Sequence, residues 1–306
     1  MNTNDQKVNE IAGKLLGKKG GEGYSSLYDP SLLVKIPRNL NREGYGIEED
    51  NLPFVGYDVW NGYEVTCLTE NGLPVTGVMK IIIPANSKYH PESKSIKMYV
   101  NSFAMTKAPF TSQKDCLNWI TYVVTTDLQN LLECEVQVRI YTSEKEEAEA
   151  CNSMYTNGNF ENIDNLQGID RIEFTEYNMN PDLLEDSKNF RTLMVRSDKL
   201  RSACRVTHQP DHGSVYVFMH GDKVPSKESL LKFIVSFRNE YHFHEEICEA
   251  IYKTLKDRYN PEALMVACNY TRRGGWDINP VRANDYQMIP IEWKSTEVML
   301  KKTIKQ

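Results

Sequence analysis

The sequence predicts an α+β protein built from two copies of one module, each an antiparallel sheet with helices packed on one face. The length of 306 residues suits two domains of roughly 150 residues. The order strand, strand, helix, helix, strand is predicted in each half of the chain. In addition, SIKMYVNSF at 95–103 matches SLLKFIVSF at 229–237 in hydrophobic class, in both serines and in the closing Phe. We therefore expect modules at 1–145 and 146–306.

The first module begins with two expected strands, at 52–66 and at 74–85, because aromatic and β-branched residues are dense there. The turn residues Glu70, Asn71 and Gly72 lie between them and predict a hairpin. Apolar residues at helical spacing predict a helix over 112–132, and strict alternation predicts a strand over 134–141. The first 25 residues are polar and glycine-rich, so we expect them to be loosely held.

The second module repeats this order. Segments 202–208 and 213–221 predict a hairpin, and 227–239 and 243–259 predict helices, the first with Ser226 as its N-cap. Segment 262–270 predicts a strand, and 286–293 is a further candidate strand. The acidic, Asn-rich stretch 143–186 is expected to connect the modules.

Composition excludes several classes of protein. A net charge of −6 argues against a broad nucleic-acid-binding surface, and no segment is apolar for long enough to cross a membrane. No signal peptide is visible, so we expect a cytoplasmic location without membrane or nucleic-acid partners. Seven cysteines without a CxxC pair predict neither a disulfide framework nor a zinc site, and G-x-G-x-x-G and Walker motifs are both missing from the sequence.

The segment SACRVTHQPDHG at 202–213 places Cys204 seven residues before Asp211, across an expected Pro-Asp-x-Gly turn. A thiol facing a carboxyl suits addition of sulfur to an electrophilic carbon while the acid delivers a proton. A buried structural cysteine is the alternative. His244 and Glu245 follow at the expected start of a helix. His242 and His244 would point about 200° apart on a helix, which excludes a shared metal ion, and a carboxylate such as Glu245 can accept two N–H groups of a guanine-like edge.

Two further segments suit phosphate groups. ESKSIKMY at 92–99 offers hydroxyl and ammonium donors at Ser93 and Lys94, and a solvated charge run is the alternative interpretation. TRRGGW at 271–276 combines arginines with glycines that allow close approach of the backbone to a ligand.

Taken together, these motifs resemble the long, bimodular nitrile reductases of queuosine biosynthesis, the QueF family. The resemblance runs through LYDPSLLVKIPRNLNR, LPFVGYDVWNGYE, ESKSIKMYVNSF, CRVTHQPDHGS, LLKFIVSFRNEYHFHEE and YTRRGGWDINPVRAN. It implies the tunnelling fold, whose modules assemble into a barrel around a tunnel, and an NADPH-dependent reduction of 7-cyano-7-deazaguanine through a covalent cysteine thioimide. A homodimer is expected, because the family's tunnel needs more modules than one chain provides.

The resemblance also implies roles for individual residues. Cys204 would be the nucleophile, Asp211 the general acid and His244 a catalytic and substrate-binding residue. Contacts to the substrate would further come from Pro91, Glu92, Ser93 and Glu245. Contacts to NADPH would come from Ser93, Lys94, Arg273 and Gly274, and no metal is implied.

The chain departs from the family pattern at His212, where the family usually carries a bulky aromatic, and at Trp276, where a smaller aliphatic is common. Neither change removes a group that the chemistry needs. Two other functions stay open. An amidine-forming relative would add ammonia to the same nitrile, although such relatives lack the ESKS-type segment; a catalytically silent binding protein could share the fold. A pterin- or GTP-using enzyme is disfavoured, since no histidine triad suited to zinc is present.

Overall fold

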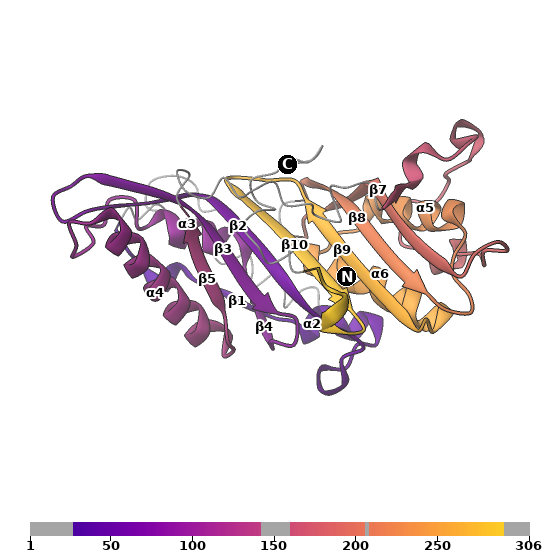
Figure 1. Cartoon of the computed structure of the whole chain (residues 1–306), viewed down its shortest axis with the longest axis horizontal. Helices are drawn as coiled ribbons and strands as arrows, with labels where there is room; N and C mark the ends of the chain where they lie inside the picture. Colours follow the sequence, from indigo (N-terminus) through magenta and orange to yellow (C-terminus); the bar gives the residue numbers. More distant parts are fainter. Residues whose placement is uncertain (1–26, 142–159, 206–207, 291–306) are drawn as a thin grey trace. The chain divides into compact units, whose positions relative to one another are not determined.

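The computed structural model describes residues 27–141, 160–205 and 208–290 (Figure 1). Their contacts divide them into two compact units. The first comprises residues 27–50, 59–141 and 273–277, and the second comprises 51–58, 160–205, 208–272 and 278–290. The expected module boundary at 145/146 lies outside the described residues.

The first unit contains strands in the order β5-β3-β2, and β3 pairs with β5 antiparallel. A helix, α4, packs against β3 and β5 and buries Ile120, Val124 and Leu128 at four-residue spacing. The elements are β1 (Lys35–Pro37), α2 (Asn39–Arg42), β2 (Val55–Leu68), β3 (Pro74–Pro84), β4 (Tyr89–Pro91), α3 (Ser93–Asn101), α4 (Gln113–Leu132) and β5 (Gln137–Tyr141), and the first four residues of β2 are counted with the second unit.

The second unit contains strands in the order β10-β9-β8-β7-β6, antiparallel except for the parallel pair β6–β7. Here α5 packs against β7, and α6 packs against β9 (Figure 1). The elements are β6 (Glu161–Asn162), β7 (Thr192–Ala203), β8 (Pro210–His220), α5 (Lys227–Val235), α6 (His244–Tyr259), β9 (Ala263–Tyr270) and β10 (Trp276–Ala283), whose first two residues are counted with the first unit. The α+β class with antiparallel sheets and packed helices is therefore confirmed.

The predicted repeat is supported by equivalent hydrogen bonds inside each unit. In the first, the Ser102 hydroxyl donates to Tyr99 O in the last turn of α3 and accepts the amide of Asp29, at 2.6 and 3.1 Å. In the second, the Ser236 hydroxyl donates to Phe233 O at the end of α5 and accepts the amide of Asn180, at 2.7 and 3.3 Å.

The segments docked onto these serines also correspond. Asp29 caps the 3-10 turn Pro30–Leu32, and Asn180 caps the 3-10 turn Pro181–Leu183, each through a side-chain oxygen. In both turns proline occupies the first helical position, where its missing N–H costs nothing. The repeat therefore extends beyond the two matching segments, to Asp-Pro-Ser-Leu-Leu at 29–33 and Asn-Pro-Asp-Leu-Leu at 180–184.

Two expectations about local structure were wrong, and one strand was missed. The Pro210–Gly213 segment is not a turn but the start of β8, and Gly213 is needed because a Cβ there would lie 2.8 Å from the carbonyl oxygen of Asn269 on β9. The described part of the candidate strand 286–293 instead holds a 3-10 turn, Tyr286–Met288. The actual strand, β10, lies ten residues earlier and was not predicted.

Candidate active site

Cys204 lies at the end of the β7–β8 hairpin, in the second unit. Its amide donates to Gln209 O at 2.8 Å and its carbonyl accepts from His208 N at 2.9 Å, so the chain reverses directly after it. Ser202 pairs with Asp211 across the two strands. Because side chains alternate along an extended chain, Cys204 and Asp211 share one face of this hairpin. The thiol is half-buried.

Asp211 is in contact with His244, which begins α6. The carboxylate oxygen Oδ2 lies 3.4 Å from His244 Nε2, and both side chains are largely buried. The imidazole stacks on the ring of Tyr270 from β9, with centroids 3.8 Å apart and planes within 4°. Its other nitrogen, Nδ1, is buried and has no hydrogen-bond partner among the described residues. The ring is thus fixed in orientation and retains a polar atom that a bound ligand could satisfy.

The first turn of α6 presents His244 and Glu245 at a defined position. Phe243 is extended and precedes the helix, and its amide donates to Glu246 Oε2 at 3.3 Å. A bond from the N-cap amide to the side chain of the third helical residue is one half of a capping box and a common way to begin a helix. Glu245 is 4% exposed. Two carboxylate oxygens in such a place can accept a pair of parallel N–H groups.

The ESKS segment lies in the first unit, at the start of α3. Glu92 is the N-cap, and its two carboxylate oxygens accept the amides of Lys94 and Ser95, at 3.0 and 2.7 Å. Burial raises the pKa of Glu92, and these amide hydrogen bonds and the Lys94 charge oppose the rise. Pro91 precedes it as the last residue of β4, and Ser93 is half-buried while Lys94 is exposed. The Ser93 hydroxyl also donates to Oε1 at 3.4 Å, so Glu92 has a structural role in its own unit and keeps a lone pair for a further donor on Oε2.

Arg273 and Gly274 belong to a tight turn in the same unit. Arg273 and Trp276 exchange backbone hydrogen bonds, and Gly274 and Gly275 have φ of 55° and 74°, as a two-residue type I′ turn requires. The glycine pair is thus explained by turn geometry, rather than by a ligand alone. Lys97 Nζ donates to the carbonyl of Arg273 at 2.7 Å, so the turn is held against α3.

The structure thus groups the predicted residues within the units. Asp211 on β8 contacts His244, which is followed by Glu245 at the start of α6, and Cys204 lies at the end of the same hairpin as Asp211. The other group contains Pro91, Glu92, Ser93, Lys94, Arg273 and Gly274, which lie on β4, α3 and the glycine turn. Sequence reasoning missed Tyr270, which orients His244, and Ser202, whose fully buried hydroxyl has no hydrogen-bond partner among the described residues.

The two departures from the family pattern lie in different surroundings. His212 is half-buried in β8, and its carbonyl accepts the amide of Thr271 at 2.9 Å. Trp276 is 3% exposed, and its indole ring lies against the backbone of Gly62, where a Cβ would be 2.5 Å from the ring. The absence of a side chain at position 62 makes room for the large residue at 276.

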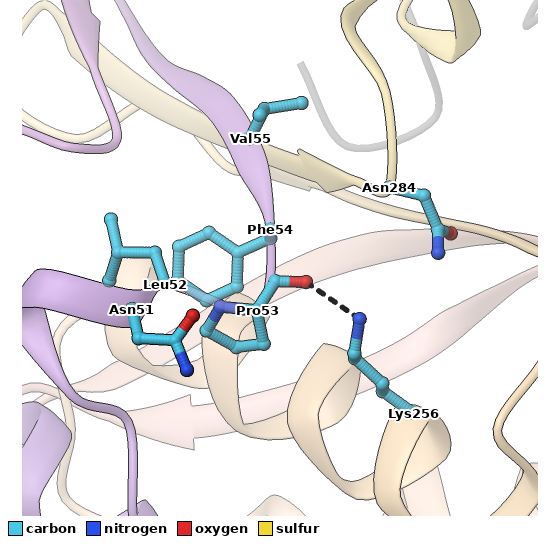
Figure 2. A pocket seen from close by; sticks show the side chains of 7 residues that line it. All are labelled: Asn51, Leu52, Pro53, Phe54, Val55, Lys256 and Asn284. Carbon is cyan, nitrogen blue, oxygen red and sulfur yellow. Dashed lines mark hydrogen bonds between the residues drawn. The ribbon is translucent and has the colours of Figure 1, made fainter.

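A cavity of about 480 Å³ lies elsewhere in the second unit (Figure 2). Lys256 Nζ donates to Pro53 O at 3.1 Å beside it, and none of the predicted site residues lines it. Within the described ranges, no three His, Cys, Asp or Glu side chains gather closely enough to hold a metal ion. Likewise, no described helix combines the length and apolar character of a membrane span.

Comparison with known proteins gives two family matches. Residues 24–140 match the N-terminal part of nitrile reductase, 7-cyano-7-deazaguanine reductase, and residues 210–288 match the QueF-like proteins. The two segments together cover more than half of the chain. Among solved structures, an archaeosine synthase, QueF-like, in the apo form is similar at 20% identity and a TM-score of 0.30, over 34% of this chain and 100% of that one.

Proposed function

The chain belongs to the QueF family, and on this premise we propose that it reduces the nitrile of 7-cyano-7-deazaguanine to an aminomethyl group with two molecules of NADPH. Family membership supports a nitrile reductase type of enzyme with a role in queuosine- or archaeosine-type pathways. The observation that carries the specific proposal is the hairpin that puts Cys204 on one face with Asp211, which in turn contacts His244.

In the first chemical step, the Cys204 thiolate adds to the nitrile carbon and forms a C–S bond. The electron pair of the C≡N bond that is lost moves to nitrogen, where Asp211 delivers a proton, and the product is a thioimide. His244 Nε2, 3.4 Å from Asp211 Oδ2, can stabilise the carboxylate that remains. Cys204 leaves as the thiolate after the first reduction, and a second reduction of the resulting imine completes the four-electron change.

The substrate contacts are proposed from the same premise. Glu245 would accept two N–H groups of the deazaguanine, and His244 would add its unsatisfied Nδ1. Pro91, Glu92 and Ser93 are proposed as further substrate contacts. Exclusion of water matters here, because water would hydrolyse either intermediate.

NADPH, when bound, supplies the hydrides. The chemistry of the donors on α3 and the glycine turn fits a phosphate-rich cofactor, since Lys94 and Arg273 bring two cations to one unit and Ser93 adds a hydroxyl. The amides of Lys94 and Ser95 are already bonded to Glu92, so side chains rather than the α3 N-terminus would bind the phosphates. Gly274 would let the cofactor approach the backbone. We further propose that the active form is a cytoplasmic homodimer.

Intact-protein mass spectrometry tests this function. We expect an adduct of one substrate mass after mixing with 7-cyano-7-deazaguanine, no adduct on Cys204→Ala, and release of the aminomethyl product when NADPH is added. An adduct that NADPH leaves intact and ammonia discharges would instead identify an amidine-forming enzyme. If wild-type protein forms no adduct but still binds the nitrile, it is a binding protein.

A further inference from the structure

The end of the β7–β8 hairpin is docked onto the segment that leads into α6. Ala203 N donates to Glu240 O at 2.8 Å, and Ala203 O accepts from His242 N at 3.1 Å. These two bonds make a short parallel bridge between Ala203 and Tyr241. The ring of His208, on the far side of the turn, packs on Tyr241 with centroids 4.8 Å apart. Both sides of the turn that carries Cys204 therefore contact this segment.

Arg205, the residue after the proposed nucleophile, links the turn that carries Cys204 to helix α6. Its side chain is 8% exposed, its Nε donates to Tyr241 O at 3.2 Å, and its Nη2 donates to Glu246 Oε1 at 3.0 Å. Glu246 lies in the first turn of α6 and is 4% exposed in its side chain. Through its other oxygen, Oε2, it accepts the amide of Phe243 and so also fixes where the helix begins.

The charges around Arg205 balance within this network. His242 Nδ1 lies 2.7 Å from the same Glu246 oxygen, and His242 Nε2 lies 2.9 Å from Glu240 Oε2. Two cations and two carboxylates thus lie together in a largely buried place. Burial of charge is favourable only when partners are held in good geometry, so the arrangement specifies one position for the turn.

We propose that Arg205 is a positioning residue, which holds Cys204 in register with Asp211 and His244 by binding Glu246 in the first turn of α6. It acts through the backbone of its neighbour and not on the substrate. The inference rests on the proposed function, because it assumes that Cys204 attacks the nitrile. A displacement of about 1 Å in a reacting group can cost on the order of 100-fold in rate.

Arg205→Met tests the proposal, since it keeps an apolar stem and removes every donor. Arg201→Met is the matched control, because Arg201 lies on the same strand and donates to the carbonyl of Arg238, not to a residue of α6. The rate of adduct formation on Cys204 is measured in a single turnover, and the affinity for 7-cyano-7-deazaguanine is measured by calorimetry in a Cys204→Ala background.

We expect Arg205→Met to slow adduct formation about 10- to 100-fold. Its affinity for the nitrile should stay within about threefold of the parent, and Arg201→Met should change neither quantity by more than that. An unchanged rate overturns the proposal. A fall in affinity as large as the fall in rate also overturns it, because Arg205 would then bind the ligand.

Two further variants extend the test, and the first of them also serves if Arg205→Met folds poorly. Arg205→Lys retains one charged donor and should recover part of the rate. Arg205→Met combined with Glu246→Gln should slow the reaction no more than the slower single variant, because both changes break one interaction. Fully additive losses overturn the proposal.

Hydrogen exchange separates this proposal from the proposed function. If the wild-type protein forms no adduct, the function is wrong, and positioning is then judged from the amide of Ala203 and those of 241–246. Arg205→Met should accelerate exchange in both places, while Arg201→Met should not. Unchanged exchange in Arg205→Met overturns the positioning role regardless of the reaction that the protein performs.

Discussion

His242 is an imidazole held between the carboxylates of Glu240 and Glu246. Burial disfavours its charged form, but the charge of Glu246 and hydrogen bonds to both carboxylates outweigh burial and raise the pKa of His242 to about 9, against an opposing contribution from Arg205. The same hydrogen bond lowers the pKa of Glu240. His242 is therefore protonated at neutral pH, and its close approach to Arg205, 3.3 Å between Nδ1 and Nη2, is tolerated because Glu246 accepts from both.

This shift predicts how stability depends on pH. A raised pKa in the folded state contributes stability that is complete below the unfolded value of about 6.5 and is lost as pH rises through about 9. We expect the free energy of unfolding to fall by at most about 3 kcal/mol over this window from His242 alone. Urea titrations of wild-type protein and His242→Gln between pH 6 and 10 measure it, and the decline should be smaller in the variant. Parallel curves for the two proteins would contradict the prediction.

Glu92 and Ser226 show how one position in the repeat can differ in chemistry. Each residue is the N-cap of one of the two corresponding helices, Glu92 for α3 and Ser226 for α5. Ser226 accepts the amide of Ser229, as the sequence predicted, and is sufficient to begin a helix. A carboxylate at position 92 adds a charge that capping does not require, because serine is already a good N-cap. That difference agrees with a further role for Glu92 in binding.

At the scale of elements, the repeat predicts that Ser102 and Ser236 make similar contributions to the free energy of unfolding. Both are 0% exposed, and each links the end of its helix to the amide of the residue before a Pro-containing turn. Ser102→Ala and Ser236→Ala each leave that part-buried amide without its acceptor, so we expect each to lose about 1–3 kcal/mol of unfolding free energy.

Urea denaturation of the two variants checks this pair. Ser31→Ala is the control, because Ser31 is exposed and bonds only the neighbouring Asp29 side chain and should cost less than about 0.5 kcal/mol. A large loss in one variant with no loss in the other would show that the two serines are not equivalent.

Elements with a regular pattern and a recognisable cap could be predicted from the sequence. Helix α4 begins after Ser112 and ends at Leu132, as its apolar spacing indicates, and α6 begins at His244. Strand β10 could not be predicted in this way, because all of its residues are buried and no alternation remains. Its polar residues Asp277 and Asn279, followed by Pro280, are typical of a loop, yet Asp277 Oδ1 accepts from the side chain of Asn61 at 2.7 Å and Asn279 Oδ1 accepts the amide of Tyr270 at 3.2 Å.

The residues of the candidate site also differ in whether the sequence alone could reveal them. Cys204, Asp211, His244 and Glu245 were predicted, because their chemistry and spacing are visible in short segments. The contribution of Arg205 and Glu246 was not, because an ion pair between residues 41 positions apart has no local signal. The stack of His244 on Tyr270 likewise arises from the packing of α6 against β9.

At the scale of the whole molecule, the two units are not two consecutive halves of the chain. Residues 51–58 belong to the second unit, although they precede most of the first. Within the second unit, Asp58 and Glu249 both bind Arg282 Nη2 at 2.8 Å, and Asp58 and Arg282 are 0% exposed. Pro53 O also accepts from Tyr252 and Lys256. The second unit therefore depends on a segment that is supplied from the amino-terminal half.

This organisation predicts the behaviour of a chain cut at 145/146. The fragment 146–306 lacks residues 51–58, so Arg282 keeps only one of its two carboxylate partners in a fully buried place. Breaking a buried ion pair costs about 3–5 kcal/mol, which is a large fraction of the stability of a domain. We expect this fragment to lack a cooperative unfolding transition in circular dichroism, even where the intact chain has one.

Asp58→Asn in the intact chain isolates the energetic part of this argument. It should lower the free energy of unfolding by about 3–5 kcal/mol. Asp50→Asn, at an exposed position just before the 51–58 segment, should change it by less than about 0.5 kcal/mol. A fragment 146–306 that unfolds cooperatively at the midpoint of the intact chain would mean that the second unit folds without residues 51–58. In that case the predicted boundary at 145/146 would also be a boundary of independent folding.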